Sequence, residues 1–471
     1  MNNESKYIKI NQYFDKEMLK ALKRKLKNVN QDDEGAMEII AKELCTIITL
    51  LRNEQDGELY IYNLNHYYEK AQDWLLKSLF KQLLNELGFI WTTKFEREGL
   101  GALKRDSVDV VKEFNSSNTL NFKNGLFNLD DGVLHPHNPN TTLCTYILDY
   151  EYDKTAQCPC FLDFIEKTTK GDKQLQSVLQ EVIGYSVSNE TRAEKAIMFY
   201  GTGCNGKSVL ASTLSKLVGE EQTCAISLDT LNDKFSMAGF IGKRLNIAGE
   251  NEKMPNSEKL KTLVSCDKVN VSIKYKSDWV GRLQTKHIFL MNSLPVTPDV
   301  TYGFFRKILI IPFNNTVKNE DIDRDLPKKL SAELSGIFNW AYEGYLRLVS
   351  NNFVFSQCDE IDKIMNDYKN RENPTGEFFH AVYESSPDGR IKKSSIYPKY
   401  VEWAADNGLV TMSRNKFLTS LKLTASETDS GINLDYREIN GYRYLFGYKE
   451  RMPKIQNDDI FEDDKPIDYD F

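Results

Sequence analysis

Residues 196–218 read AIMFYGTGCNGKSVLASTLSKLV, and they decide the fold because a short apolar strand, a glycine-rich loop and a helix follow one another directly. The loop, Gly201–Ser208, fits the pattern G-x-x-x-x-G-K-[ST]. Its glycines let backbone N–H groups point into one concavity that holds phosphate oxygens. The following helix would direct its N-terminus at the same anion. The stretch therefore predicts a phosphate-binding loop in an α/β protein.

The side chains of this loop suit the phosphate chain of a nucleotide. Lys207 would place a point charge between the terminal phosphates, and the hydroxyl of Ser208 can ligate Mg²⁺. The alternative is a glycine-rich turn that only caps a helix, which the flanking strand and helix disfavour. The residues expected to bind the nucleotide are Gly201, Thr202, Gly203, Cys204, Asn205, Gly206, Lys207, Ser208 and Val209.

Acidic residues follow the next apolar run of the chain. Leu245–Ala248 is predicted to be a buried parallel strand, and Gly249-Glu250-Asn251-Glu252 follows it. An acid at the end of such a strand can bind Mg²⁺ through water and polarise the attacking water. We take Glu250 as the first candidate, for catalysis and for the metal, and Glu252 as the second. The alternative is two exposed acids in a loop.

Two further apolar runs are predicted strands, His287–Met291 and Ile308–Pro312. Asn292 ends the first of them, where a polar amide can orient water, or it serves the turn before Pro295. Arg306 stands just before the second and could reach across a subunit boundary. An arginine supplied in trans is worth about 10³–10⁵ in rate. The alternative for Arg306 is an ordinary surface arginine.

Residues 267–282 read as a hairpin that is basic near its turn and carries aromatic residues. Such a tip could follow a single-stranded nucleic-acid backbone, although an ordinary solvated hairpin fits the same pattern. The cations expected to contact DNA in this segment are Lys274, Lys276 and Arg282.

The segment 376–450 is predicted to hold three helices and a hairpin with an Asn440-Gly441 turn. Three helices and a wing resemble a winged helix, in which the third helix can enter a major groove. Arg414 and Lys416 on that helix are candidate DNA contacts. Recognition of origin DNA and binding of another protein are both open for this unit.

Composition predicts the cellular compartment of the protein and its number of domains. The chain has 471 residues, a net charge of −7 and eight irregularly spaced cysteines, which predicts a soluble cytoplasmic protein of about three domains with reduced thiols. The spacing of His and Cys disfavours zinc, and no apolar run suits a membrane span or secretory signal. Residues 457–471 hold seven acids and one lysine. We expect a disordered tail, either simply solvated or docking on a replication partner.

These features divide the chain into six segments. The predicted domains are a mostly helical region 1–115, a strand and helix segment 116–195, an ATPase domain 196–350, a linker 351–375, a winged-helix-like domain 376–450 and an acidic tail 451–471. Within the third segment, residues 326–349 are predicted to form one long helix, and the only strand predicted before residue 116 is Glu58–Tyr62.

The order of these motifs resembles superfamily 3 helicases, most closely the helicase half of phage- and poxvirus-type primase-helicases. Replication-initiator helicases of Gram-positive, staphylococcal-type mobile genetic islands are similar. Upstream, Leu120–Leu129 and Leu179–Tyr185 resemble the segment that precedes the ATPase in that family. The resemblance covers about residues 58–450, and we expect no primase domain within residues 1–115.

The resemblance implies an AAA+-type P-loop ATPase core that assembles as a homo-hexameric ring, with ATP and Mg²⁺ between subunits. Lys207, Ser208, Glu250 and Asn292 would come from one subunit and Arg306 from its neighbour. The implied activity is a DNA helicase that moves 3′ to 5′ on single-stranded and forked DNA during replication of a phage or mobile element. The alternatives are a nucleotide-switched origin-binding protein without unwinding activity and a DNA translocating or packaging motor.

Overall fold

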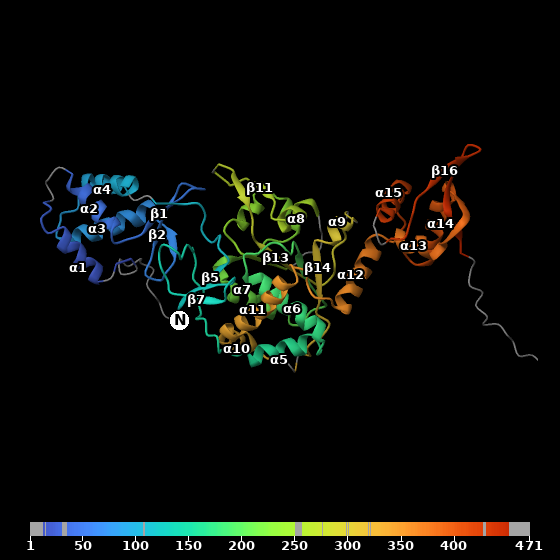
Figure 1. Ribbon diagram of the computed structural model, residues 1–471, viewed down its shortest axis with the longest axis horizontal. Helices are drawn as coiled ribbons and strands as arrows, with labels where there is room; N and C mark the ends of the chain where they lie inside the picture. The colour runs from blue at the N-terminus through green and yellow to red at the C-terminus, as the bar shows by residue number, and fades with distance from the viewer. Residues whose placement is uncertain are drawn as a thin grey trace, which may run out of the picture. The chain divides into compact units, whose positions relative to one another are not determined.

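The structure is a computed structural model (Figure 1) that divides into two compact units, residues 1–298 with 306–364, and residues 299–305 with 365–471. The residues that it describes are 13–14, 16–30, 35–106, 109–249, 257–275, 277–297, 299, 301–318, 320, 322–426 and 430–451. Each unit has its own buried core, and each is described by itself.

The first unit begins with a small α/β body. Its helices are α1 (Lys16–Lys25), α2 (Ala36–Cys45), α3 (Asp73–Leu87) and α4 (Thr93–Asp106). They pack with a four-stranded sheet of order β3-β2-β1-β4, formed by β1 (Leu50–Asn53), β2 (Leu59–Tyr62), β3 (Tyr68–Lys70) and β4 (Asp109–Val111). The prediction of a mostly helical region therefore missed three strands. Strands this short have no long alternation of apolar and polar residues to reveal them.

Two groups of elements lead into the central sheet. A three-stranded antiparallel sheet consists of β5 (Thr119–Phe122), β6 (Gly125–Asn128) and β7 (Val133–His135), and two helices follow, α5 (Pro159–Thr168) and α6 (Lys173–Val187). Asp172 caps α6, because its carboxylate accepts the backbone N–H groups of Gln174 and Leu175 at 2.8 and 3.1 Å.

The central sheet has five strands in the order β14-β8-β13-β10-β9, and every neighbouring pair is parallel. Its strands are β8 (Ala196–Tyr200), β9 (Thr223–Cys224), β10 (Leu245–Ala248), β13 (Lys286–Met291) and β14 (Ile308–Pro312). The three strands predicted downstream of the phosphate loop are thus confirmed. Their continuous apolar runs are typical of strands covered on both faces.

Helices and short 3-10 turns complete this unit. They are α7 (Lys207–Val218), 3-10 turns at Glu220–Gln222, Asp229–Asn232 and Ser236–Phe240, α8 (Ser257–Val264), α10 (Leu326–Ala332) and α11 (Leu334–Ser350). Helices α6 and α11 approach closely: a Cβ added at Gly344 would lie 2.3 Å from the Gln180 carbonyl oxygen. A glycine is therefore required at this contact.

The single helix predicted over 326–349 is wrong, because the chain breaks at Glu333 between α10 and α11. The Glu333 carboxylate instead accepts the backbone N–H groups of Cys160 and Phe161 at 3.0 and 2.9 Å. These are among the unpaired donors of the first turn of α5. Glu333 thus caps a helix far away in the sequence.

A hairpin projects from the central-sheet body (Figure 1), as predicted. It consists of β11 (Lys268–Val271) and β12 (Trp279–Arg282), which pair antiparallel from Lys268 opposite Arg282 to Val271 opposite Trp279.

The second unit contains α9 (Tyr302–Phe305), α13 (Thr375–Val382), α14 (Lys393–Asp406), α15 (Arg414–Ala425) and a sheet of order β15-β17-β16. The strands are β15 (Tyr383–Lys392), β16 (Tyr436–Ile439) and β17 (Tyr442–Glu450). Phe378, Tyr400 and Phe417, one from each of the last three helices, meet in the core: the rings of Tyr400 and Phe417 stack, and Phe378 meets both edge to face. The predicted three helices and hairpin are present.

Two features of this region differ from the sequence prediction. The segment 351–375, predicted to be a linker, contains the helix α12 (Asp359–Glu372). Its few apolar residues among many charges hide the helix from a reading that looks for an apolar stripe. Strand β15 was also not predicted, because Ser385–Gly389 reads as a turn and the pairing with β17 shifts register there.

Candidate functional site

The phosphate loop lies between the carboxyl end of β8 and the first residue of α7. Gly206 is the N-cap of α7 with a φ of +87°, and a Cβ added there would lie 2.9 Å from a ring carbon of Phe164. Glycine is therefore required by both backbone and space. Thr202, Gly203, Cys204 and Ser208 are exposed, so one side of the loop is open to a ligand.

Lys207 is buried at the base of the loop, with 6% of its surface exposed. Its ammonium group donates to the Gly201 carbonyl, to Asn205 Oδ1 at 3.0 Å and to Asn292 Oδ1 at 3.4 Å. Burial lowers the pKa of Lys207 below the ordinary lysine value, because it disfavours the charged form. An anion bound at the loop would favour that charge.

Asn205 connects the loop to Phe313, the residue that follows β14, which is the neighbour of β8 in the sheet. Its Nδ2 donates to the Phe313 carbonyl at 2.9 Å, while its Oδ1 receives the ammonium group of Lys207. The backbone N–H of Val317 also donates to the Cys204 carbonyl at 2.7 Å. The chain after β14 therefore holds the loop in shape. Nothing in the sequence indicated this second role for Asn205.

Asn292 directly follows β13, the strand between β8 and β10. The carboxyl ends of these three neighbouring strands therefore meet at one edge of the sheet, and the structure joins Lys207 and Asn292 there. The acidic candidates Glu250 and Glu252 lie outside the described residues. Gly249, which follows β10, is the last described residue before them.

Arg306 lies at the opposite end of the sheet, because it precedes β14 and the sheet is parallel. Ile308 pairs with Ala196 at the start of β8, and five strand residues span about 16 Å. Arg306 is exposed, and its carbonyl oxygen accepts Lys195 Nζ at 2.6 Å. Arg306 and the phosphate loop of the same chain therefore lie at opposite ends of the sheet.

Lys307, the residue after the exposed Arg306, does not face solvent. It is buried, its ammonium group pairs with the Glu194 carboxylate, and it donates to Ser265 Oγ at 2.8 Å. The two adjacent cations therefore differ: Lys307 is a structural contact at the amino end of the sheet, and Arg306 faces solvent.

The projecting hairpin carries one described candidate at its tip. Lys274 is exposed, with its Nζ 5.2 Å from the ring centroid of Tyr275, which is itself 92% exposed. Lys276 lies outside the described residues. Arg282 is at the base of the hairpin, where its guanidinium donates to the Cys266 carbonyl at 2.7 Å, so it does not share the tip with Lys274.

In the second unit, Arg414 and Lys416 are exposed in the first turn of α15. Ser413 occupies the N-cap position but makes no side-chain capping bond. The predicted placement of both cations on the third helix of the segment 376–450 is confirmed.

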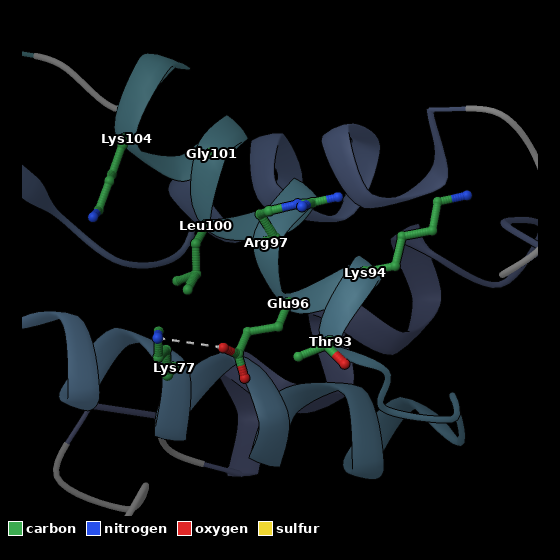
Figure 2. Close-up of a pocket in the computed structure, with 8 residues that line it drawn as sticks. All are labelled: Lys77, Thr93, Lys94, Glu96, Arg97, Leu100, Gly101 and Lys104. Carbon is green, nitrogen blue, oxygen red and sulfur yellow. Dashed lines mark ion pairs between the residues drawn. The ribbon is translucent and has the colours of Figure 1, made fainter.

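One cavity of about 550 Å³ lies between α3 and α4, and no phosphate-loop residue lines it (Figure 2). Lys77, Lys94 and Lys104, on its wall, pair with Glu96, Glu98 and Asp73 at 3.6, 3.9 and 2.7 Å. Most of its positive charge is thus already balanced, and we assign it no ligand.

Three family models match successive parts of the chain. Residues 9–170 match a family described as D5 N terminal like, residues 199–306 match a family of unknown function (DUF5906), and residues 370–462 match a family described as poxvirus D5 protein-like. Each match covers less than half of the chain.

A relative and two solved structures are also similar. A mimivirus protein from Acanthamoeba polyphaga mimivirus, named as helicase L207/L206, is 22% identical over 223 residues; the match covers 45% of this chain and 23% of that protein. The chain therefore spans less than a quarter of this relative. Together with the two D5 families, it supports a relationship to phage- and poxvirus-type primase-helicases.

The solved structures are of the C-terminal region of NrS-1. Its apo form has a TM-score of 0.52 at 13% identity, covering 89% of this chain and 100% of that one. Its A-form apo structure has a TM-score of 0.51 at 14% identity, covering 86% of this chain and 98% of that one. At these identities the likeness concerns the fold alone. Among the described residues, moreover, no helix has the length and apolar character needed to cross a membrane.

Proposed function

We propose that this protein is an ATP-dependent DNA helicase of superfamily 3 that works as a hexameric ring in the replication of a phage or mobile element. One observation carries the proposal: Lys207 and Asn292 meet at the carboxyl edge of the central sheet while Arg306 is exposed at its amino edge. A ring of identical subunits can bring these two edges together, because each interface joins two different surfaces.

The strand order supports an AAA+-type core. Taken in chain order from β8, the strands lie as 5-1-4-3-2, so the strand carrying Asn292 lies between the phosphate-loop strand and the strand that precedes Glu250. ATP would lie on the loop with Mg²⁺ held by Ser208 and, through water, by Glu250. Lys207 would pair with the terminal phosphates and Asn292 would orient the attacking water.

Arg306 of the adjoining subunit would stabilise the charge that develops on the transferred phosphoryl group. Movement of the hairpin tip, with Lys274 and Tyr275, would follow turnover and draw one DNA strand through the ring, 3′ to 5′ as the resemblance implies. Exposed rings and cations are the chemistry that sequence-independent single-strand binding uses.

The winged-helix-like unit keeps a second candidate open, a nucleotide-switched protein that binds origin DNA without unwinding it. The exposed Arg414 and Lys416 at the start of α15 favour it. A translocating or packaging motor would share the ATPase site.

Strand separation of a forked duplex distinguishes these functions. We expect unwinding with ATP and Mg²⁺, none after chelation of the metal, and none for Lys207→Ala, whose ATP hydrolysis should fall to background. ATP hydrolysis without strand separation would contradict the helicase proposal and favour the switch or motor.

A further inference from the structure

The sheet of the second unit presents aromatic side chains on its outer face. Leu445 of the central strand β17 is fully buried against the helices and pairs with Ile391 of β15. Because side chains alternate along a strand, the residue one position after Leu445 and those one and three positions before it point away from that core. These residues are Tyr442, Tyr444 and Phe446.

Cations from both neighbouring strands cover these rings. Lys392 Nζ lies 3.9 Å from the ring centroid of Tyr442. The guanidinium of Arg390 lies 5.5 Å from the ring of Tyr444, and that of Arg437 lies 4.9 Å from the ring of Phe446. We call the set of Tyr442, Tyr444, Phe446, Arg390, Lys392 and Arg437 the aromatic face.

The turn between β16 and β17 determines which residues lie on this face. Asn440 and Gly441 both have positive φ, +51° and +77°, as a tight two-residue hairpin turn requires. This turn pairs Ile439 with Tyr442 and Arg437 with Tyr444. A shift of one residue would turn the rings into the core, so the Asn-Gly turn holds the aromatic face outward.

The face is accessible and spaced for separated bases. Tyr442 is 54% exposed, and the two other rings are half-buried beneath their cations. Alternate residues of a strand lie about 6.8 Å apart, about twice the ~3.4 Å rise between stacked bases of a duplex. Rings with this spacing suit bases that have come apart from one another.

We propose that the aromatic face binds single-stranded DNA, with bases stacked on Tyr442 and Tyr444 and phosphates held by Arg390 and Lys392. Each nucleobase has a flat π-face that stacks on an aromatic ring, and cations beside the ring pair with the backbone. In a duplex these base faces are covered by neighbouring bases. The ligand that fits the face is therefore the single strand.

This site goes beyond the proposed function, because it lies outside the central-sheet unit and needs no nucleotide. It would give the protein a second hold on the strand that a helicase produces. The acidic segment 457–471, outside the described residues, has the charge to compete for the same cations.

Photocrosslinking tests the contact directly. The full chain, without nucleotide, is irradiated with an oligothymidine that contains 5-iodouracil, and the crosslinked peptides are mapped by mass spectrometry. We expect crosslinks at Tyr442 or Tyr444, in the full chain or in a chain lacking residues 457–471. Crosslinks at the hairpin residue Tyr275 alone would overturn this inference and leave the helicase proposal intact, and absence of crosslinks at the aromatic face in both proteins would also overturn it.

Binding measurements with matched variants test the mechanism. Tyr442→Ala should weaken oligothymidine binding about 5- to 150-fold, because one stacked base is worth about 1–3 kcal/mol, whereas Tyr442→Phe keeps the ring and should bind as the parent. Arg443→Ala is the control, since Arg443 lies on the same strand but on the other face. Equal binding by Tyr442→Ala and the parent would overturn the proposal, as would equally effective competition by a duplex of the same length.

Discussion

At the scale of the residue, burial distinguishes side chains of the central sheet that have a structural role from those that are free to contact a ligand. Lys307 and Arg306 are neighbours, yet only Arg306 faces solvent. His287, on β13, is a further buried group: its ring lies against Phe240 and Phe289, and neither of its ring nitrogens has a hydrogen-bond partner among the described residues.

Burial lowers the pKa of His287 from its ordinary value to about 3, with a smaller effect of Lys286. The folded state therefore keeps the imidazole neutral, whereas the unfolded chain protonates it below about pH 6.5. His287 therefore costs no stability above pH 6.5. As the pH falls below this value, the free energy of unfolding decreases, by about 2 kcal/mol at pH 5. Urea unfolding of His287→Phe should show a smaller loss between pH 7 and pH 5 than the parent; an equal loss would place the acid sensitivity elsewhere.

At the scale of the element, the proposal assigns DNA contact in the first unit to the β11–β12 hairpin. Lys274→Ala should weaken single-strand binding and lower the slope of log affinity against log salt by about 0.7 for each lost phosphate contact. Lys268→Ala is the control, because Lys268 is an exposed lysine of the same hairpin at its base. The same salt dependence in both variants would contradict a tip contact.

The break between α10 and α11 places Glu333 where its carboxylate caps the first turn of α5. Glu333→Ala should lower the stability of the first unit by about 1–2 kcal/mol, since two N–H groups and the positive end of α5 lose their acceptor. Glu333→Gln keeps an acceptor and should lose less. Thermal unfolding measures both, and an unchanged midpoint for Glu333→Ala would show that the cap is dispensable.

The elements that the sequence predicted correctly are those with one dominant physical pattern. The buried strands β8, β10 and β14 are continuous apolar runs, and the phosphate loop has an unambiguous glycine spacing. The break at Glu333 escaped prediction because its cause is the start of α5, more than 170 positions earlier in the chain. The contact of Asn205 with the Phe313 carbonyl is equally long-range. Such contacts leave no local periodicity.

At the scale of the whole molecule, the proposed ring would make the two ends of the central sheet two halves of one site. Lys207 lies at one end and Arg306 at the other, about the length of a strand apart. In a head-to-tail ring each subunit offers its phosphate loop to one neighbour and its Arg306 to the other. Loss of Arg306 should then slow hydrolysis by about 10³–10⁵ while nucleotide binding is largely retained.

Mixing two inactive variants tests this arrangement most directly. Lys207→Ala keeps Arg306, and Arg306→Ala keeps the phosphate loop, so an interface between one of each contains a complete site. We predict that each variant alone is inactive and that an equal mixture, after subunit exchange, recovers about a quarter of the parent ATP hydrolysis, the share of complete interfaces in random head-to-tail rings. Full activity of Arg306→Ala alone, or no recovery in mixed assemblies whose subunit exchange is shown by mass measurement, would contradict a site shared between neighbouring subunits.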